Sequence, residues 1–520
     1  MIYSFDFHLF RGLGGRGGVK GQGSSANLPS AIRATPPMAL SLASYYQNWP
    51  RWNTQLLFFL IIVAVVLKYI HRHLRSTEKA TQHDLSKQPD HNKASFLSFQ
   101  RTYLLVFYVT QLADWLQGPT MYELYSEYTS DRTYTTSESP LRDCLFNTGD
   151  SSTLCHPAKW GQSFIGTLFI TGFATSSVAS LFVGPLIDTY GRKLSCLVYC
   201  VLEIIINTME HSADMRVLLF GRFLGGISTS ILFVSFESWM VTEHRSRGFP
   251  DQWMSSTNAW AQIGNGVLAV FAGIVCQIMK DTYGPIGPFK LAIATTCTIL
   301  SLVFFTWNEN YGNATTSLQS SFSEAWKYVI GSPTVVCLGL TQALFEGAMY
   351  TFVFNYVPTL YRVGITSTGL VFSCLMVCVT IGGVLFEMFV GETALKALAI
   401  NASMFALYTF VMGTLAFLMA SLFSDNFYCV IVAFCMFETC VGAAFASMAT
   451  LRSQLLPQEL QGTIMNIFRV PLNLLVVIGT KLDSWYEADF IFGTCAIWLL
   501  VAVACQTYVV VNEGGLKKEK

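Results

Sequence analysis

The stretch GPLIDTYGRK, residues 184–193, decides the fold because it sets opposite charges between two long apolar runs. Asp188 closes the run that begins near Gly161, and Arg192 and Lys193 open the next one. Opposite charges at adjoining helix ends can hold or release neighbouring helices at one face of a membrane. The alternative is a basic turn that serves only to orient the chain in the bilayer.

The composition of the chain excludes a water-soluble globule. Of 520 residues, 52% are hydrophobic and only 12% are charged, whereas about 25% are charged in a typical soluble domain. So large an apolar excess cannot be hidden in one core, and part of the surface must face lipid. Lysine plus arginine and aspartate plus glutamate both number 32, so no basic field attracts nucleic acid. We therefore expect a lipid bilayer as a partner and no nucleic acid.

Sequence motifs for a cofactor or for catalysis do not occur. The 14 cysteines lie mostly in apolar runs without paired CxxC spacing, and the eight histidines fall outside the expected mid-membrane segments, so we expect no metal site. The sequence contains no GxxxxGK[ST] phosphate loop, no HExxH and no nucleophile elbow. These observations predict a protein that is not an enzyme and that needs no cofactor.

Apolar segments recur along the chain after residue 53. Residues 54–70 form one run near the minimum length of about 17 residues for a span, and about twelve more runs of roughly 17–26 residues follow. Only helices satisfy their own backbone polar groups in lipid without closing a barrel, and these runs lack the alternation of barrel strands. The sequence therefore predicts an all-α polytopic membrane protein. The twelve runs begin near Phe96, Gly161, Leu194, Val217, Asn258, Phe289, Pro333, Gly369, Ala397, Phe427, Thr463 and Ala488.

Two polar stretches interrupt the twelve runs, and the second divides them into six and six. This division favours two six-helix bundles around a central site, plus one extra N-terminal helix. The N-terminal tail is rich in glycine and arginine and poor in acids, so we expect it to be disordered, and a transit peptide is the alternative. We expect, in chain order, the tail at 1–53, an extra transmembrane helix at 54–75, a cytosolic linker at 76–97, a six-helix bundle at 98–306, a central cytosolic linker at 307–332, a second bundle at 333–511 and a cytosolic tail at 512–520.

Lysine and arginine residues concentrate on one side of the expected helices, which the positive-inside rule places in the cytosol. Arg192 and Lys193 lie on this side. With the extra helix counted, the N-terminus is extracytosolic and the C-terminus is cytosolic. Cys144 and Cys155 fall in the first extracytosolic loop, where an oxidising compartment would allow a disulfide; two unpaired thiols are the alternative.

Charged residues inside the apolar runs mark candidate transport sites. A charge at membrane depth costs about 2.5–3.5 kcal/mol on insertion scales, so each one needs a partner or a function. At about 1.5 Å of rise per residue, Asp114 and Arg222 fall in the outer half of the membrane, and Glu346 and Glu438 fall near its midplane. These groups can face one cavity. Asp114 and Arg222 could instead form a salt bridge that only locks two helices.

The eleventh of the twelve runs adds the candidates Asn466 and Arg469. Pro471 lies in the same run, and a proline within a helix frees backbone carbonyls and often marks a bend that lines a cavity. Arg222 and Arg469 would suit an oxyanion because a guanidinium matches its geometry, while the carboxylates would suit a coupling proton. Arg469 is the leading anion contact, and its alternative role is that of counter-ion to a buried glutamate.

The charged loop also carries a resemblance to a known superfamily. It resembles the signature G-x-L-x-D-x-x-G-R-K of the major facilitator superfamily, and Thr189 stands where an arginine often follows the aspartate. The resemblance implies the fold of that superfamily and a gating role for the matching residues. These are Gly184, Asp188, Gly191, Arg192 and Lys193.

Five longer strings are similar to the molybdate-anion transporter family, the major facilitator superfamily domain-containing protein 5 group, over about residues 98–510. The strings are ADWLQGPTMYELY (113–125), GRFLGGISTSILFVSFESWMVTEH (221–244), FPDQWMSSTNA (249–259), TQALFEGAMYTFVFNYVP (341–358) and NIFRVPLN (466–473). The resemblance implies a secondary active transporter that carries molybdate, a tetrahedral divalent oxyanion, across the plasma membrane into the cytosol, and we expect it to be monomeric. The alternatives are a transporter of another small anion or a sugar with the same fold, and a membrane receptor that does not transport.

Overall fold

The computed structural model describes residues 51–79, 90–132, 157–311, 318–365, 367–390, 400–457, 460–483 and 486–519. Helices make up most of this part of the chain, and no strand occurs within it. The expected disulfide partners Cys144 and Cys155 lie outside the described residues, as do residues 1–50 of the expected tail. The described ranges have the all-α class that the sequence predicts.

Twelve long helices correspond to the twelve expected apolar runs, and the run expected near Ala397 begins at Ala402. Ten helices of the described residues are long and apolar enough to cross a membrane, and these ten include an extra helix that precedes the twelve. The number is eleven if the bent helix described below counts as one span. In chain order the twelve are α3 (Asp90–Gln117), α6 (Pro157–Tyr190), α7 (Arg192–Met209), α8 (Met215–Ser246), α9 (Asp251–Tyr283), α10 (Gly287–Thr306), α12 (Pro333–Arg362), α13 (Thr368–Phe389), α14 (Ala402–Leu422), α15 (Phe427–Leu455), α16 (Gln461–Asp483) and α17 (Ala488–Glu519).

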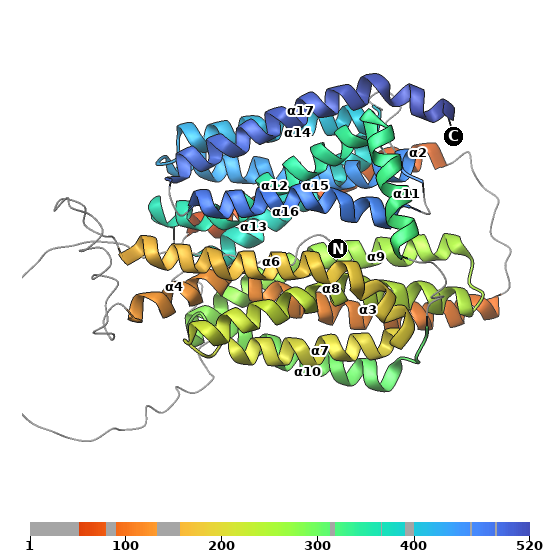
Figure 1. Cartoon of the computed structure of the whole chain (residues 1–520), viewed down its shortest axis with the longest axis horizontal. Helices are drawn as coiled ribbons and strands as arrows, with labels where there is room; N and C mark the ends of the chain where they lie inside the picture. Colours follow the sequence, from red (N-terminus) through yellow and green to blue (C-terminus); the bar gives the residue numbers. More distant parts are fainter. Residues whose placement is uncertain are drawn as a thin grey trace, which may run out of the picture.

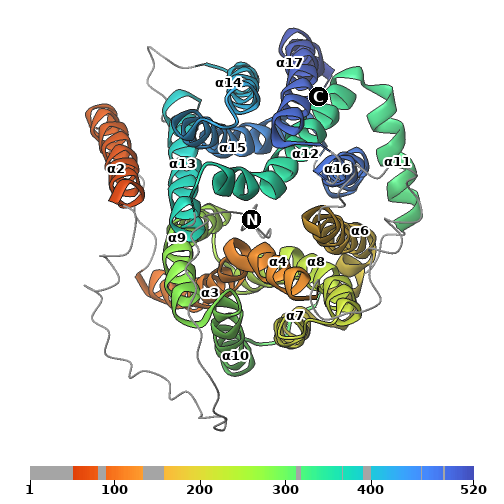
Figure 2. The same ribbon diagram turned by 90° about the vertical axis from the view of Figure 1, so that its left-hand side faces the viewer.

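The twelve helices form two bundles. Helices α3 and α6–α10 pack against one another in the first bundle, and α12–α17 pack against one another in the second (Figures 1 and 2). The bundles meet where α9 packs on α13 and where α6 packs on α16. At the first contact the backbones come close, since a Cβ atom on Gly273 would lie 2.7 Å from the carbonyl oxygen of Gly369. Small residues at such crossings allow membrane helices to approach each other.

An extra helix, α2 (Arg51–Lys79), precedes the twelve and packs on α13 of the second bundle (Figure 2). Leu57 and Leu60 share an apolar cluster with residues of α13, and the side-chain amide of Asn53 donates to the hydroxyl of Ser367. The other face of α2 exposes large apolar side chains such as Phe58 and Ile62, as the lipid-facing side of a membrane helix does. The structure therefore has the expected architecture of two six-helix bundles plus one extra N-terminal helix.

Two further helices lie where the hydropathy pattern suggests only polar connections. After the short 3-10 turn η1 (Gly118–Thr120), helix α4 (Met121–Arg132) continues the path of α3, and α11 (Leu318–Gly331) joins the bundles. α11 packs on α12 and α16, with Ala325 and Val329 buried one turn apart. Hydropathy averaged over a span does not detect such helices, because α4 has 12 residues and α11 has 14, fewer than the about 20 that a span needs.

The charged loop of residues 184–193 lies at one end of the first bundle. Helix α6 bends by 57° between its segments Phe164–Ser180 and Phe182–Tyr190, four residues before Pro185, whose ring clashes with the carbonyl group of residue i−4. The α6–α7 turn contains Gly191, at φ +112°. We call this side of the molecule the Gly191 end, and we call the opposite side, where α4 lies, the Glu123 end.

Candidate functional site

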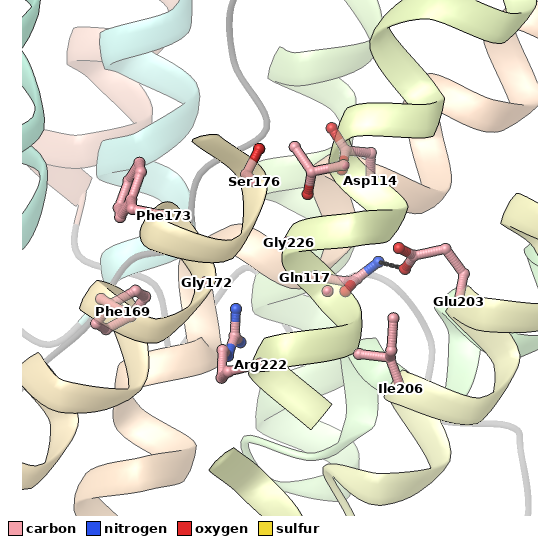
Figure 3. A pocket seen from close by; sticks show the side chains of 12 residues that line it. Asp114, Gln117, Phe169, Gly172, Phe173, Ser176, Glu203, Ile206, Arg222 and Gly226 are labelled. Carbon is pink, nitrogen blue, oxygen red and sulfur yellow. Dashed lines mark hydrogen bonds between the residues drawn. The ribbon is translucent and has the colours of Figure 1, made fainter. Parts of the chain in front are cut away.

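A cavity opens inside the first bundle between α3, α6, α7 and α8 (Figure 3). Its volume is about 60 Å³, and one water molecule needs about 10–15 Å³. The cavity therefore has room for several water-sized groups, which suits a small ion. It is lined by Asp114, Gln117, Phe169, Gly172, Phe173, Ser176, Glu203, Ile206, Arg222, Gly225, Gly226 and Thr229.

Glycines set the distance between the two helices at the back of this cavity. A Cβ atom on Gly226 of α8 would lie 2.5 Å from the carbonyl oxygen of Gly172 on α6. No larger residue fits there without moving a backbone, so α6 and α8 cross in close contact. Arg222 lies one turn before Gly226 on α8 and extends between the two helices (Figure 3).

Tyr125, Glu210 and Phe169 contact the guanidinium of Arg222 and hold it in place. Its Nε and Nη2 atoms donate to the hydroxyl oxygen of Tyr125 over 2.7 and 2.6 Å, and Nη2 lies 3.4 Å from Oε1 of Glu210. The guanidinium carbon also lies 5.3 Å from the ring centre of Tyr125 and 5.6 Å from that of Phe169, a cation–π geometry. The side chain of Arg222 is 11% exposed and still lines the cavity.

Glu210 is the buried counter-charge behind this arginine. Its side chain is 1% exposed and stands at the C-terminal end of α7, in the turn that leads to α8. Oε1 of Glu210 accepts from the hydroxyl of Tyr125 over 2.7 Å, and the carbonyl oxygen of Glu210 accepts from the hydroxyl of Tyr128 over 2.8 Å. The side chains of α4 and the α7–α8 turn thus fix the position of the positive charge.

Two further carboxylates line the opposite wall of the cavity. Asp114 projects from α3, and Glu203 projects from α7. Glu203 accepts hydrogen bonds from Ser228 over 2.7 Å, from Gln117 over 3.2 Å and from Asn207 over 3.2 Å. The cavity therefore brings the predicted residues Asp114 and Arg222 together, with Glu203 as a second acidic lining residue.

The aromatic wall of the cavity faces the second bundle. The ring of Phe169 lies 4.9 Å from that of Phe354, and the ring of Phe173 lies 5.1 Å from that of Tyr350. Phe354 and Tyr350 belong to α12. Glu346 lies one turn before Tyr350, and residues four apart share one helix face. The cavity and Glu346 therefore lie on the two sides of the contact between the bundles.

The second bundle carries its own group of polar side chains near this contact. The amide nitrogen of Gln342 donates to Oε1 of Glu346 over 2.8 Å, and Nη1 of Arg452 donates to the amide oxygen of Gln342 over 3.1 Å. Gln342 thus bridges a carboxylate and a guanidinium. Arg452 comes from the last turn of α15, and the sequence analysis does not identify it as a site residue.

The remaining predicted site residues occupy different environments. Arg469 of α16 is half-buried and forms no hydrogen bond or ion pair with a described residue. Glu438 of α15 is 1% exposed and lies within the core of the second bundle. Asn466 also belongs to α16, but its side chain lies outside the described part.

The loop motif forms a compact polar turn at the Gly191 end. Nη2 of Arg192 lies 2.6 Å from Oδ1 of Asp188, and Arg192 also donates to the hydroxyl of Thr242 on α8. The carboxylate of Glu309, which follows α10, accepts from the backbone N–H groups of Lys193 and Leu194 over 2.8 and 2.9 Å. An acidic cap at a helix N-terminus satisfies unpaired donors and the helix dipole. The motif thus ties α6, α7 and α8 to the end of α10.

Sequence reasoning missed the two residues that hold Arg222. Tyr125 lies in a stretch without a strong apolar pattern, and Glu210 lies in a polar turn that suggests solvent exposure. A usable signal is the requirement that an arginine at membrane depth has an acidic partner. Glu210 is such an acid, twelve residues earlier and across the α7–α8 turn.

Comparisons with known proteins agree with this arrangement. The family model for sugar transporters with twelve transmembrane segments matches residues 76–139 and 158–422. A nucleoside transporter, NupG, has a TM-score of 0.58 at 9% identity, covering 79% of this chain and 99% of its own. A D-xylose–proton symporter has a TM-score of 0.57 at 12% identity, covering 80% and 96%. The two-bundle fold and the polar cavity define a multi-pass membrane protein of the major facilitator class.

Sequence relatives narrow this class further. The molybdate-anion transporter of Xenopus tropicalis is 30% identical over 424 residues, which cover 79% of this chain and 85% of the relative. The molybdate-anion transporter of Takifugu rubripes is 27% identical over 452 residues, which cover 79% and 86%. The chain belongs to the molybdate-anion transporter family of the major facilitator superfamily.

Proposed function

We propose that this protein is a secondary active transporter that carries molybdate into the cell by alternating access. The observation that supports this proposal best is the guanidinium of Arg222, which lines a cavity of the first bundle whose aromatic residues Phe169 and Phe173 contact the second bundle. The names of the relatives supply the substrate, and the cavity supplies a chemistry that suits it. We propose from these two observations that the protein transports its substrate and does not catalyse a reaction. We also propose that it acts as a monomer and without a cofactor.

The charges of the site suit a divalent oxyanion from two sides. A guanidinium offers paired N–H donors that match two oxygens of a tetrahedral anion. Arg222 belongs to the first bundle, and Arg469 belongs to the second and keeps its donors unused by the described residues. We propose that the two arginines bind the anion together when the bundles close around it, with Asn466 as a neighbouring donor.

The acidic groups require a proton to accompany the anion. A divalent oxyanion beside Arg222 would face the carboxylate of Asp114 across a small cavity. Two negative charges that close together repel each other strongly where the dielectric constant is low. Protonation of Asp114 would remove this repulsion, so we propose it as the coupling group. Glu346 would act as counter-charge to Arg469 in another conformation of the cycle, and Glu438 would remain a buried structural carboxylate.

The proposed cycle fits a plasma-membrane protein with its Gly191 end in the cytosol. The Gly191 end carries Arg192 and Lys193, and basic residues favour the cytosolic side. This orientation places the N-terminus outside the cytosol and the C-terminus inside it. We propose that residues 98–306 and 333–511 move as two units, with 76–97 and 307–332 as cytosolic linkers.

Uptake of labelled molybdate into cells that lack their own carrier tests the proposal. We expect uptake above background, loss of uptake in Arg222→Ala and Arg469→Ala at equal surface expression, and persistence of uptake in excess sulfate. Arg216→Ala is the matched control, because Arg216 is an exposed arginine at the start of the same helix, α8. A well-expressed protein without uptake would contradict molybdate as the substrate. Competition by a sugar would indicate an organic solute, and binding without uptake would indicate a receptor.

A further inference from the structure

A second buried ion pair lies at the Glu123 end of the first bundle, and its carboxylate is also hydrogen-bonded to the second bundle. Nζ of Lys280 on α9 lies 2.7 Å from the carboxylate of Glu123 on α4. The same carboxylate accepts from the hydroxyl of Tyr361 over 2.7 Å and from the hydroxyl of Thr368 over 2.9 Å. Tyr361 belongs to α12 and Thr368 to α13. We call these four residues the Glu123 clasp.

The clasp is shielded from water and backed by close packing. The side chains of Glu123 and Lys280 are 7% and 16% exposed. One turn and two turns away on α9, Gln277 and Gly273 contact Gly369 of α13, whose N–H donates to the amide oxygen of Gln277 over 3.0 Å. Opening between the bundles would take the hydroxyls of Tyr361 and Thr368 away from the charged carboxylate of Glu123, and the loss of hydrogen bonds to a buried charge requires a compensating gain elsewhere. The Glu123 end therefore cannot open between the bundles while the clasp is formed.

Helix α4 connects the clasp to the anion cavity. Glu123 and Tyr125 are two residues apart, and two residues of an α-helix are rotated by about 200°, so they point to opposite sides. Glu123 points to the second bundle, whereas Tyr125 points to Arg222 and Glu210. A displacement of α4 that weakens one set of contacts must act on the other, because a single helical turn carries both.

We propose that the Glu123 clasp is the gate at this end and that Tyr125 is the positioning residue that links it to Arg222. An anion at Arg222 takes over the donors that now point at the hydroxyl of Tyr125. The freed α4 then moves, Glu123 leaves Tyr361 and Thr368, and the Glu123 end opens. This inference rests on the proposed transport function for the identity of the anion, but the link between Arg222 and the gate does not depend on which anion binds.

Cysteine labelling from each side of the membrane tests this gate. Ser176 lines the cavity, so labelling of a Ser176→Cys variant reports from which side of the membrane an impermeant thiol reagent can enter. The labelling of the parent chain, which has its own cysteines, is the background. We expect Glu123→Gln and Lys280→Met to raise labelling from the Glu123 side several-fold and to lower it from the Gly191 side. The double variant should label no more than either single variant, and Lys280→Arg should stay close to the parent. A general loosening of the fold would instead raise labelling from both sides.

The link through α4 has its own readout. We expect Tyr125→Phe, which removes the hydroxyl that Arg222 contacts, to shift labelling to the Glu123 side without any anion present. Glu243→Gln is the matched control, because it removes a carboxylate bonded to Arg247 within one helix rather than between bundles. Unchanged labelling in both Glu123→Gln and Lys280→Met would overturn the gate, and unchanged labelling in Tyr125→Phe alone would overturn the link. Failure of the transport proposal shows separately, as absent molybdate uptake in a parent whose variants still change their labelling.

Discussion

Asp188 and Arg192 form an ion pair of 2.6 Å across the α6–α7 turn, and the guanidinium of the pair also reaches Thr242 on α8. A substitution in this pair therefore acts on the relative position of three helices. Because the carboxylate of Asp188 is 36% exposed, solvent screens the pair, and a single pair of this kind contributes about 0.2–1 kcal/mol to stability. Its importance lies in the geometry of the turn rather than in the folding free energy.

Asp188→Asn should consequently lower transport more than stability. We expect the maximal rate of uptake to fall several-fold while the melting temperature in detergent changes by no more than a few degrees. Asp425→Asn is a suitable control, because the Asp425 carboxylate is 86% exposed and lies 4.0 Å from Arg362. A normal rate in Asp188→Asn would show that the turn serves only to orient the chain.

Gly191→Ala should lower the stability of the Gly191 end. Gly191 adopts φ +112° and ψ +141°, and a Cβ atom there would lie 2.6 Å from the carboxyl carbon of Glu309. Backbone strain of this kind costs about 1–3 kcal/mol. A thermal unfolding measurement should show a lower melting temperature, whereas Gly184→Ala should unfold like the parent, since a Cβ atom on Gly184 would meet nothing within 4 Å. Equal melting temperatures for the two variants would contradict this assignment.

Arg222→Ala should affect both folding and transport, and a second substitution can separate the two effects. Removing the guanidinium leaves the carboxylate of Glu210 buried without this cation, and breaking a buried pair costs about 3–5 kcal/mol. Adding Glu210→Gln removes the remaining charge. We expect the double variant to regain much of the melting temperature of the parent while uptake stays at background. Recovered uptake in the double variant would show that Arg222 has a structural role only.

Arg222→Lys tests whether the shape of the guanidinium matters. Lysine keeps the charge, but it cannot donate two parallel N–H groups to one anion. We expect the KM for molybdate to rise by about tenfold, which corresponds to about 1.4 kcal/mol of binding free energy, with the protein still folded. The measurement is the concentration dependence of initial uptake at matched surface expression. An unchanged KM would mean that only the charge is recognised.

Arg469→Ala and Arg452→Ala should behave differently, because only one of the two arginines has a hydrogen-bond partner among the described residues. Arg452 donates to Gln342, so we expect its removal to lower the melting temperature. Arg469 forms no such bond, and its removal should change the free energy of unfolding by no more than about 0.5 kcal/mol while uptake is lost. The result to look for is a stable, transport-dead Arg469→Ala protein. A stable protein with normal uptake would exclude Arg469 from the site.

The sequence alone determines the class of this protein, because hydropathy is a local property. A span needs about 20 mostly apolar residues, and the twelve apolar runs read from the sequence become the helices α3, α6–α10 and α12–α17. The motif of residues 184–193 is also local, since Asp188 and Arg192 are four residues apart on the chain and pair in the structure. The arginine at membrane depth in α8 and the aspartate in α3 were visible for the same reason: a charge in an apolar run is detectable without knowledge of its neighbours.

Only the tertiary structure decides which groups meet these charges. Arg222 pairs with Glu210 across the α7–α8 turn and with Tyr125 from a helix that the hydropathy pattern does not reveal. Glu123 and Lys280 are 157 residues apart, and their contact depends on how α4 and α9 pack, not on any periodicity. Partners on different helices come together through packing and through the need to compensate buried charge. Those two effects depend on three-dimensional neighbours, which a linear pattern does not contain.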